Sequence, residues 1–349
     1  TDPEASDDSV SKPENSEHPS DKLNIANDGQ DSTNATGVVQ NCMASVVGIY
    51  VGNTTISYAT GETQEQDTGS GSGVIITDDG YIVTNNHVVQ GADTIHVYLQ
   101  DGTKYDAKLI GTDTFSDLAI VKIDVANLPA ATIGSSGNVT VGDTVYAIGN
   151  PLGVLTSSVS KGIISGLDRT ITIDGISMTL MQTDASINPG NSGGGLFNES
   201  GELIGIVNAK SASVEVEGLG FAIPVDSARP VITDLVDLGY VTGRPYIGIT
   251  MQDVSLRYGN SNNRNNPFSF YMDNYVTRVQ VMSVESGSAA EKGGLLVNDI
   301  LMSLNGKEIT GSSQFAAMLY EYKVGDTVTI TVLRGNETKD LTVVLGERS

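Results

Sequence analysis

Between residues 38 and 224 the chain alternates short apolar runs with turn residues, a pattern that predicts β-strands rather than helices. The runs are "SVVGIYV", "SGVIITDDGYIVTNN", "TIHVYLQDGTKYDAKLIG", "LAIVKI", "TVYAIG", "GGLFNESGELIGIV" and "LGFAIP". Three dipeptides typical of hairpin turns separate strands: Asp79-Gly80, Asp101-Gly102 and Ser200-Gly201. We therefore predict one all-β domain of antiparallel strands, folded as a barrel or a sandwich.

The hydrophobic period changes after Pro224. In "VDSARPVITDLVDLG", residues 225 to 239, the apolar positions fit one face of a helix, which would close the first domain. Asp226 or Ser227 can cap its start, and Gly239 can end it. The expected apolar face consists of Val231, Ile232, Leu235, Val236 and Leu238.

The ends of the chain differ from this first domain. After "YVTGRP", which is typical of a linker, residues 246 to 349 predict a second unit of mixed strands with one helix near residues 312 to 322. Its Asn-rich stretch, residues 258 to 275, is typical of a mobile loop. Residues 1 to 36 hold nine acidic and two basic residues, which favours a disordered tail or tether. We thus expect a tail (1–37), a first domain (38–240) and a second domain (244–349).

Charge and composition narrow the function classes. The net charge of −23 argues against binding to nucleic acid, which needs a basic face, and against binding to anionic lipid surfaces. Cys42 is the one cysteine, so it cannot form an internal disulfide, and we expect a small buried hydrophobe. No run approaches the ~18 apolar residues of a membrane helix. We expect either a soluble protein or one whose signal or anchor precedes residue 1.

The stretch "QTDASINPGNSGGGLF", residues 182 to 197, places a serine among glycines. Residues 190 to 194 fit the loose pattern G-x-S-x-G, which marks a strand-to-helix turn in α/β-hydrolases. That interpretation fails because a run of glycines starts a helix poorly. Instead, glycines let consecutive N–H groups converge where a tetrahedral intermediate places its oxyanion. Gly190 and Ser192 are the expected donors, and Ser192 is the candidate nucleophile.

A serine nucleophile needs an imidazole as base, and the chain has three histidines. His18 lies in the expected tail. His96 lies in "TIHVYLQ", where alternation places it opposite the apolar positions, so we expect a solvated strand residue. His87 ends the strand in "YIVTNNHVV" and enters a turn, where functional side chains concentrate. His87 is therefore the expected base.

The imidazole in turn needs a carboxylate to fix its tautomer. Asp117 in "TFSDLAIVKI" precedes an apolar strand, where a buried acid would be held rigidly. The alternative is an aspartate that only caps a turn. The order His87, Asp117, Ser192 within one all-β domain is much more specific than any of the three residues alone.

These residues lie in stretches that resemble a known family. "GSGSGVIITDDGYIVTNNHVV", "DLAIVKI", "AIGNPLG", "QTDASINPGNSGGGLFN" and "GLGFAIP" resemble the protease domain of the HtrA (Deg) family, while "RPYIGI", "GSAAEKGGLLVNDILMSLNGKEI" and "VGDTVTITVLRGN" resemble its PDZ domain. The resemblance covers about residues 38 to 349. It implies a mainly β protein, with a chymotrypsin-like double β-barrel protease domain followed by a C-terminal PDZ domain of mixed α/β structure.

The resemblance implies the same roles for His87, Asp117 and Ser192. It places the oxyanion hole at Gly190, Asn191 and Ser192. It also implies that Ile187 lines the pocket for the residue before the cleaved bond. Because residues 186 to 190 contain no acidic side chain, small or medium apolar residues are the expected preference. The resemblance implies neither a cofactor nor a metal.

In the second domain, "YIGI" resembles the carboxylate-binding loop of a PDZ domain. Backbone N–H groups of Ile247, Gly248 and Ile249, after Tyr246, would hold the carboxylate of a peptide that adds as a strand. The alternative is an ordinary edge strand after a linker. The Asn-rich stretch and the variant turn "EKGGLLVND" depart from the family pattern, so the resemblance does not extend to peptide specificity.

Two functions from different classes fit this sequence. The first is a serine endopeptidase of protein quality control that cleaves unfolded or misfolded proteins, with a PDZ domain that binds peptide C-termini and regulates activity. The second is a peptide-binding or chaperone-like scaffold. A secreted digestive protease is disfavoured because such enzymes commonly rely on disulfides. The resemblance further implies a homotrimer, contacting through residues 38 to 47, and an extracytoplasmic location, with any membrane anchor before residue 1.

Overall fold

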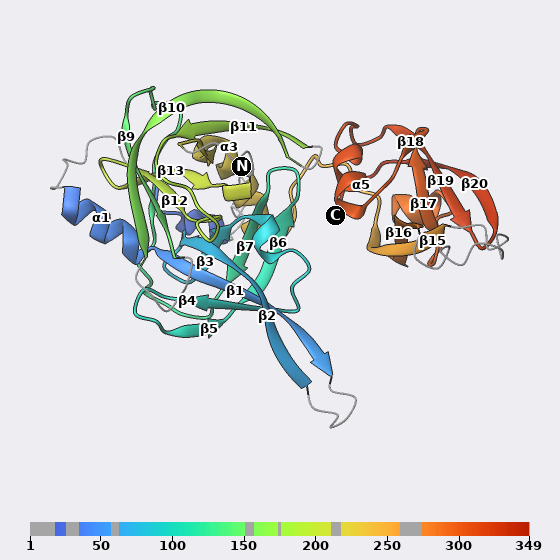
Figure 1. Ribbon diagram of the computed structural model, residues 1–349, viewed down its shortest axis with the longest axis horizontal. Coiled ribbons are helices and arrows are strands. Elements are labelled where there is room, and N and C mark those ends of the chain that lie inside the picture. The colour runs from blue at the N-terminus through green and yellow to red at the C-terminus, as the bar shows by residue number, and fades with distance from the viewer. Residues whose placement is uncertain are drawn as a thin grey trace, which may run out of the picture.

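The computed structural model describes residues 18–25, 35–56, 63–150, 157–173, 176–210, 218–258 and 274–348. These residues form three β-sheets, of which two belong to a large first domain and one to a smaller second domain (Figure 1). The first seventeen residues of the expected tail lie outside the described residues. Most of the Asn-rich stretch, residues 259 to 273, also lies outside them.

The first sheet has seven strands in the order β5-β4-β1-β2-β3-β7-β6. All neighbours pair antiparallel, as the hairpin turns predicted. Two of the predicted turn glycines, Gly80 and Gly102, have positive φ and join β2 to β3 and β4 to β5. The strands are β1 (Val46–Ile56), β2 (Thr63–Ile75), β3 (Tyr81–Thr84), β4 (Thr94–Tyr98), β5 (Lys104–Asp106), β6 (Lys108–Asp113) and β7 (Leu118–Lys122).

The second sheet also has seven strands, in the order β12-β9-β10-β11-β14-β13-β8. Because β12 also pairs with β13, this sheet curls back on itself. β10 and β11 curve over the top of the domain in Figure 1. The strands are β8 (Thr132–Ile133), β9 (Thr144–Gly149), β10 (Ser158–Ile173), β11 (Ile176–Thr183), β12 (Gly195–Asn198), β13 (Glu202–Val207) and β14 (Gly220–Pro224).

Each sheet encloses its own apolar core, and a third cluster joins them. Val47, Ile49 and Val121 lie in the core of the first sheet, and Val145 and Leu196 in that of the second. The joining cluster is built from both sheets and from the helices α1 (Ala35–Ala44) and α3 (Val225–Leu238). Burial of these side chains holds the two sheets in a fixed relation. Any site built from both sheets is therefore positioned by the core itself.

Helix α3 confirms the change of period after Pro224, with two corrections, one to its apolar face and one to its N-terminal cap. Its inward side chains are Val231, Ile232, Leu235 and Val236, all buried, whereas Leu238 is 48% exposed. The residue preceding the helix is Pro224, which has no side-chain cap. Asp226 lies one residue inside the helix, where its carboxylate accepts from the Gly137 N–H at 2.7 Å and from Ser135 Oγ at 2.9 Å. It therefore ties the helix to a loop of the second sheet instead of capping the helix.

Part of the expected tail contacts the first domain. Residues 18 to 25 include the short helix η1 (Pro19–Lys22). Ser20 Oγ donates to Asp237 at 2.6 Å, and Lys22 Nζ donates to Asp79 at 2.8 Å. Asn24 and Ile25 continue along β8, where Ile25 forms a parallel bridge with Ile133. The acidic composition gave no indication of this contact. The contact depends on a few paired polar groups, which leave no apolar pattern in the sequence.

The second domain is a six-stranded antiparallel sheet with two helices. Its strands run β15-β16-β17-β19-β20, with β18 paired to β17. The predicted helix near residues 312 to 322 is shorter than expected, because α5 ends at Leu319 and Tyr320 caps it. The elements are β15 (Ile249–Tyr258), β16 (Asn274–Val284), α4 (Ala289–Lys292), β17 (Ile300–Leu304), β18 (Lys307–Glu308), α5 (Ser312–Leu319), β19 (Thr327–Arg334) and β20 (Glu337–Val344).

The two domains meet between the β6–β7 loop and α5 (Figure 1). The Phe115 and Tyr320 rings lie 5.1 Å apart. The guanidinium of Arg244, in the linker, stacks 4.4 Å from the Phe115 ring centre and donates to Asp113 at 3.0 Å. Asp113 is 3% exposed. Burial of Tyr320, together with the negative charge of the Asp113 carboxylate, raises the pKa of Tyr320. The linker is thus anchored to the loop that leads to Asp117.

Candidate active site

His87 lies where a strand of the first sheet ends. β3 stops at Thr84, and the short helix α2 (Asn86–Val89) carries the histidine. The N–H groups of Asn86 and His87 donate to the Asp117 carbonyl at 3.1 Å and to Asp117 Oδ1 at 3.0 Å. Asn85 Nδ2 donates to the same carbonyl at 3.0 Å. The turn that presents the histidine is therefore built on the candidate acid.

Asp117 is 9% exposed and adopts a left-handed backbone conformation, with φ of 53°. Aspartate is among the few non-glycine residues that tolerate this region. Its Oδ2 accepts from His87 Nδ1 at 2.7 Å and from Asn208 Nδ2 at 2.9 Å. The carboxylate is thus held from three sides and fixes the orientation of the imidazole.

Ser192 completes the chain of contacts from the second sheet. Its Oγ lies 3.0 Å from His87 Nε2 and accepts from the Ala209 N–H at 3.2 Å. An imidazole that donates from Nδ1 to a carboxylate can accept the serine proton at Nε2. The structure therefore brings together all three residues predicted from the sequence, in the order that general-base activation of a serine requires.

The loop before Ser192 corrects one predicted residue. The Asn191 N–H donates to the Asn188 carbonyl at 3.0 Å, so it is not available to an oxyanion. Among the described residues the N–H groups of Gly190 and Ser192 donate to no acceptor. Gly190 has φ of 95° and Gly193 has φ of 82°; a Cβ on Gly193 would lie 2.2 Å from the Ser72 carbonyl oxygen. The glycines are needed for this conformation, and two of the three predicted oxyanion donors, the N–H groups of Gly190 and Ser192, stay candidates.

Sequence reasoning missed Asn208. It follows the apolar strand β13 as His87 follows β3, and a polar residue directly after a buried strand was the available signal. Asn208 is 1% exposed and is the second side chain that donates to the Asp117 carboxylate. Its contact partner lies 91 residues earlier, and no local pattern reveals that pairing.

The other two histidines lie away from this site. His18 precedes η1, where its N–H donates to Asp21 at 3.0 Å. His96 is 7% exposed, so the prediction of a solvated residue is wrong. Its Nδ1 and Nε2 contact Asp106 Oδ1 at 2.9 Å and Glu65 Oε1 at 2.6 Å. Strand alternation places His96 on the expected face, but the β2 residue Glu65 covers that face.

Among the described residues at least three hollows border the second sheet, of which one lies beside His87 and another beside α3. A narrow cleft beside the triad is lined by His87, Asp117, Met178 and Lys210, among others. Ile187 is half-buried, and a Cβ on Gly220 would lie 2.5 Å from its Cγ1. The lack of a side chain at Gly220 therefore lets Ile187 pack against it, and neither residue lines the cleft.

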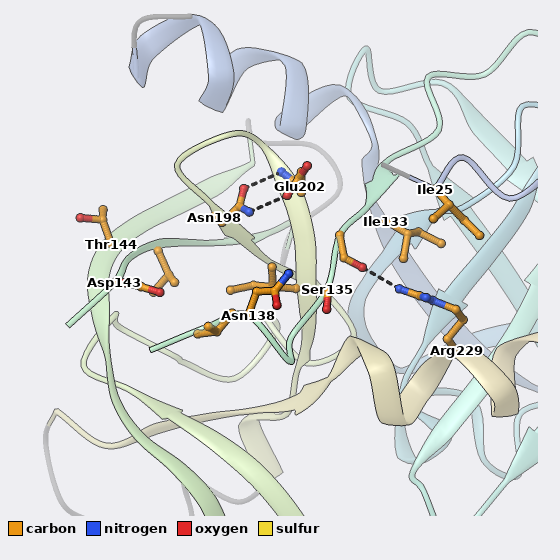
Figure 2. A pocket seen from close by; sticks show the side chains of 13 residues that line it. Ile25, Ile133, Ser135, Asn138, Asp143, Thr144, Asn198, Glu202 and Arg229 are labelled. Carbon is orange, nitrogen blue, oxygen red and sulfur yellow. Dashed lines mark hydrogen bonds between the residues drawn. The ribbon is translucent and has the colours of Figure 1, made fainter. Parts of the chain in front are cut away.

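Another hollow is a pocket of about 240 Å³ between the second sheet and α3 (Figure 2). Some of its polar side chains already have partners: Arg229 donates to the Gly134 carbonyl at 2.7 Å, and Asn198 donates to Glu202 at 2.8 Å. None of the residues that line it belongs to the triad. Within the described residues, no group of three or more His, Cys, Asp and Glu side chains could hold a metal ion.

The "YIGI" stretch lies at the edge of the third sheet. Tyr246 forms an antiparallel bridge with Gly346, and Ile247 is 4% exposed. The Ile247 and Gly248 carbonyls accept from the N–H groups of Ala290 at 2.8 Å and Glu285 at 2.9 Å. Gly248 has φ of 81°, and a Cβ there would lie 2.3 Å from Ser288 Cβ. The carbonyls thus point into the domain.

One of the two large sheets positions His87 and Asp117, the other positions Ser192, and a smaller sheet domain follows. This combination defines a trypsin-like serine endopeptidase with one C-terminal PDZ domain. Matches to family models agree: residues 71–206 match the trypsin-like peptidase domain and residues 245–345 match the PDZ domain.

Known proteins extend the match to both domains together. The chain is 38% identical over 335 residues to the serine protease Do-like HtrA of Bacillus subtilis, which covers 91% of this chain and 74% of that protein. It is 41% identical over 288 residues to a probable periplasmic DegP-like serine endoprotease of Pseudomonas savastanoi, covering 82% of this chain and 57% of that protein.

Solved structures agree with these relatives. The HtrA-type protease AlgW with a decapeptide matches with a TM-score of 0.55 at 32% identity, covering 91% of this chain and 99% of that one. A serine endoprotease from Yersinia pestis matches with a TM-score of 0.52 at 34% identity, covering 92% and 100%. The chain belongs to the HtrA family of serine proteases. The predicted mainly β fold, with a protease domain and a PDZ domain, is confirmed.

Proposed function

We propose that this chain cleaves unfolded or misfolded proteins, with Ser192 as nucleophile, His87 as general base and Asp117 as its orienting acid. The observation that carries the proposal is the unbroken chain of contacts from Asp117 Oδ2 through the imidazole to Ser192 Oγ, at 2.7 and 3.0 Å. Each member of that chain comes from a different part of the fold, so its alignment is not a by-product of local structure.

In the acylation step, Ser192 Oγ attacks the substrate carbonyl carbon while His87 Nε2 takes its proton. The carbonyl oxygen becomes an oxyanion, which the N–H groups of Gly190 and Ser192 stabilise; one such donor is worth about 3 kcal/mol. The protonated imidazole, held by the Asp117 carboxylate, then gives its proton to the leaving amine. Water repeats the sequence on the acyl-enzyme and restores Ser192. Ile187 is proposed to contact the side chain before the cleaved bond.

The test is substitution of the nucleophile. Ser192→Ala is expected to abolish casein cleavage and labelling by a fluorophosphonate, because loss of a triad nucleophile costs on the order of a millionfold in turnover. The thermal unfolding of the variant should match wild type. If the wild-type chain neither cleaves nor labels, the scaffold hypothesis replaces this one. Activity of Ser192→Ala within tenfold of wild type would show that another residue is the nucleophile.

We also propose that the PDZ domain binds the C-terminal carboxylate of a peptide at residues 246 to 249. Strand β15 pairs only with β16 among the described residues, so its other edge is available for an added strand. The Tyr246 N–H donates to the Gly346 carbonyl at 2.8 Å, and the Ile247 and Gly248 carbonyls are turned into the domain. The N–H groups of Ile247, Gly248 and Ile249 are therefore the groups proposed to meet a carboxylate. An apolar peptide with a free C-terminus should bind, and its C-terminal amide should bind at least tenfold more weakly in a fluorescence titration.

A regulatory route from the PDZ domain to the active site is proposed through the β6–β7 loop. Arg244, two residues before Tyr246, donates to Asp113, and Asp113 accepts the Ser116 N–H and hydroxyl at 3.1 and 2.7 Å. Asp117 is the next residue of the same loop. Arg244→Ala should therefore change peptide activation of the full chain, by a factor within the 5- to 150-fold range of typical coupling. Unchanged activation would remove this loop from the route.

We further propose that the protein is extracytoplasmic and forms a homotrimer. Relatives named as periplasmic endoproteases support an extracytoplasmic location. In the described residues no helix combines the length and apolar character that crossing a membrane requires. The expected contact of a homotrimer through residues 38 to 47 needs revision, because Val38, Cys42 and Val46 are buried in the chain's own core. Light scattering measures the oligomeric state, and a monomer at micromolar concentration would contradict the proposed trimer.

A further inference from the structure

Ser72 lies on β2 of the first sheet and contacts the nucleophile loop of the second sheet twice. Its Oγ donates to the Gly190 carbonyl at 2.7 Å, and its backbone N–H donates to the Ser192 carbonyl at 2.8 Å. The same Oγ accepts from the Asn150 N–H at 2.8 Å, and the Ser72 carbonyl accepts from Thr84 Oγ1 at 2.7 Å. Every polar atom of this residue, which is 0% exposed, is therefore used.

These contacts hold the residues on either side of the Asn191–Ser192 peptide, whose N–H is a proposed oxyanion donor. In a trans peptide the C=O and N–H groups point in opposite directions. Ser72 holds the carbonyls of Gly190 and Ser192, while the Asn191 carbonyl between them accepts from the Gly194 N–H at 2.9 Å. With the Asn191 carbonyl held in this way, the N–H of Ser192 must point the other way, towards the substrate. The direction of the donor is set by its neighbours rather than by the donor itself.

Among the described residues, the Ser72 hydroxyl is the one side-chain donor to the carbonyls of Gly190, Asn191 and Ser192. Backbone groups make the other contacts, and Gly193 packs so closely on the Ser72 carbonyl that a Cβ would lie 2.2 Å away. Without the hydroxyl, the half-buried Gly190 carbonyl and the Asn150 N–H would both lose a partner, which costs free energy that a rotated Gly190 peptide can recover. Glycine rotates with little steric resistance, so this peptide is where the loop would give way.

We propose that Ser72 is a positioning residue that holds the oxyanion hole in its productive conformation. This inference rests on the proposed function, because it assigns a role within the same reaction. Ser72 touches neither the substrate nor the transferred proton. It acts through Gly190 and Ser192, and it does so from the sheet that carries His87, so that one residue ties the two halves of the site together.

Ser72→Ala removes the hydroxyl with little change in volume. We expect kcat for a short chromogenic peptide to fall about 10- to 100-fold, in the range caused by misplacing an oxyanion donor. Affinity for a peptidyl trifluoromethyl ketone, whose adduct with Ser192 places an oxyanion in the hole, should fall by the same factor. Affinity for the uncleaved peptide, measured in a Ser192→Ala background, should change less than twofold. A purely structural role would not separate the two ligands.

Ser45→Ala is the matched control. Ser45 is 2% exposed, and its Oγ donates to the Cys42 carbonyl at 2.7 Å, so its loss removes the same kind of bond away from the site. It should lower thermal stability to a similar extent and leave both kcat and the ketone affinity unchanged. Ser72→Cys, which keeps a weak donor, should lie between wild type and Ser72→Ala. If Ser72→Ala does not fold, the comparison of wild type with Ser72→Cys takes its place, with at least a threefold loss expected.

The outcomes separate the two levels of the argument. A wild-type chain that neither cleaves nor labels at Ser192 overturns the proposed function and this inference with it. An active wild type, together with a Ser72→Ala variant that keeps kcat and ketone affinity within twofold, overturns the role of Ser72 alone. Equal losses for the ketone and for the uncleaved peptide would also overturn it, because they would indicate a general disturbance of the cleft.

Discussion

Two histidines of the first sheet are held by carboxylates, yet only one of them faces a serine. His87 contacts Asp117 through Nδ1 and Ser192 through Nε2. His96 contacts Asp106 through Nδ1 and Glu65 through Nε2. The partner of Nδ1 is an aspartate in both cases, so it does not distinguish the two rings. The partner of Nε2 does.

A carboxylate accepts hydrogen bonds, whereas a hydroxyl both donates and accepts. His87 can therefore keep a lone pair at Nε2 and take the proton of Ser192. His96 has a carboxylate at each ring nitrogen, so neither nitrogen faces a hydroxyl, and the ring joins β2, β4 and β5 through these contacts. The comparison teaches that a buried histidine beside an aspartate is not by itself a base.

The largest expected effects come from replacing each histidine in turn. One replacement should affect activity and the other stability. His87→Ala should reduce kcat/KM on the order of a millionfold while thermal stability stays close to that of wild type. His96→Ala should leave kcat/KM within about threefold at 25 °C and lower the free energy of unfolding by about 0.5–3 kcal/mol, because a ring that is only 7% exposed is lost from between three strands. Steady-state cleavage and chemical unfolding of both variants provide the check. Loss of activity in folded His96→Ala would contradict the division of roles.

The aspartates that face Nδ1 provide the next test. Asp117→Asn should lower kcat about ten-thousandfold, because an amide in place of the carboxylate favours the wrong tautomer of His87. Asp106→Asn is the matched control: its side chain is 90% exposed, and the change should alter kcat by less than twofold. Both are measured with the same chromogenic peptide. Similar losses in the two variants would mean that the active site depends on general charge rather than on the tautomer.

Simple local signals were enough to predict three residues that the structure brings into contact. His87 ends an apolar strand, Asp117 precedes one, and Ser192 lies in a glycine run. The same kind of reasoning failed for His96. Alternation gave its face of β4 correctly but not what covers that face, since Glu65 lies 31 residues earlier and meets His96 only through the register of β1, β2 and β4.

The hydrogen-bond partners that support the triad were not predictable for the same physical reason. Ser72 meets Gly190 across 118 residues, and Arg244 meets Asp113 across 131. Such pairs leave no period in the sequence, because strand pairing between sheets and domains brings them together. Hydrophobic patterning could predict that two sheets pack, but not which polar groups face each other where they meet. Likewise, the acidic composition of the N-terminal segment gave no sign that Ser20 and Lys22 bind the first domain.

A smaller effect is expected at Asn208, which donates to the same Asp117 oxygen as His87. Asn208→Ala should lower kcat about tenfold, because a buried carboxylate loses one of its charge-assisted hydrogen bonds and holds the imidazole less firmly. KM should change less than twofold, since Asn208 lies behind the triad. The measurement also tests whether His87 needs an acid that is held by a second side chain. Unchanged kcat would show that the imidazole alone keeps Asp117 in place.

The smallest expected effect concerns the carboxylate at Nε2 of His96. The nearby Thr94 hydroxyl and the His96 ring hold the pKa of Glu65 below its ordinary value. A carboxyl whose pKa is lower in the folded state binds protons more readily after unfolding, so its contribution to stability is present at neutral pH. That contribution is lost as the pH falls through the folded-state pKa of Glu65.

The melting temperature of Glu65→Gln should therefore lie slightly below that of wild type at pH 7, and the difference should shrink on acidification to pH 3. Glu199→Gln, on an exposed hairpin turn, is the control, and its difference from wild type should not depend on pH. A Glu65→Gln difference that is the same at both pH values would show that His96 does not need a charged partner at Nε2, and the proposed contrast with His87 would then rest on Asp106 alone.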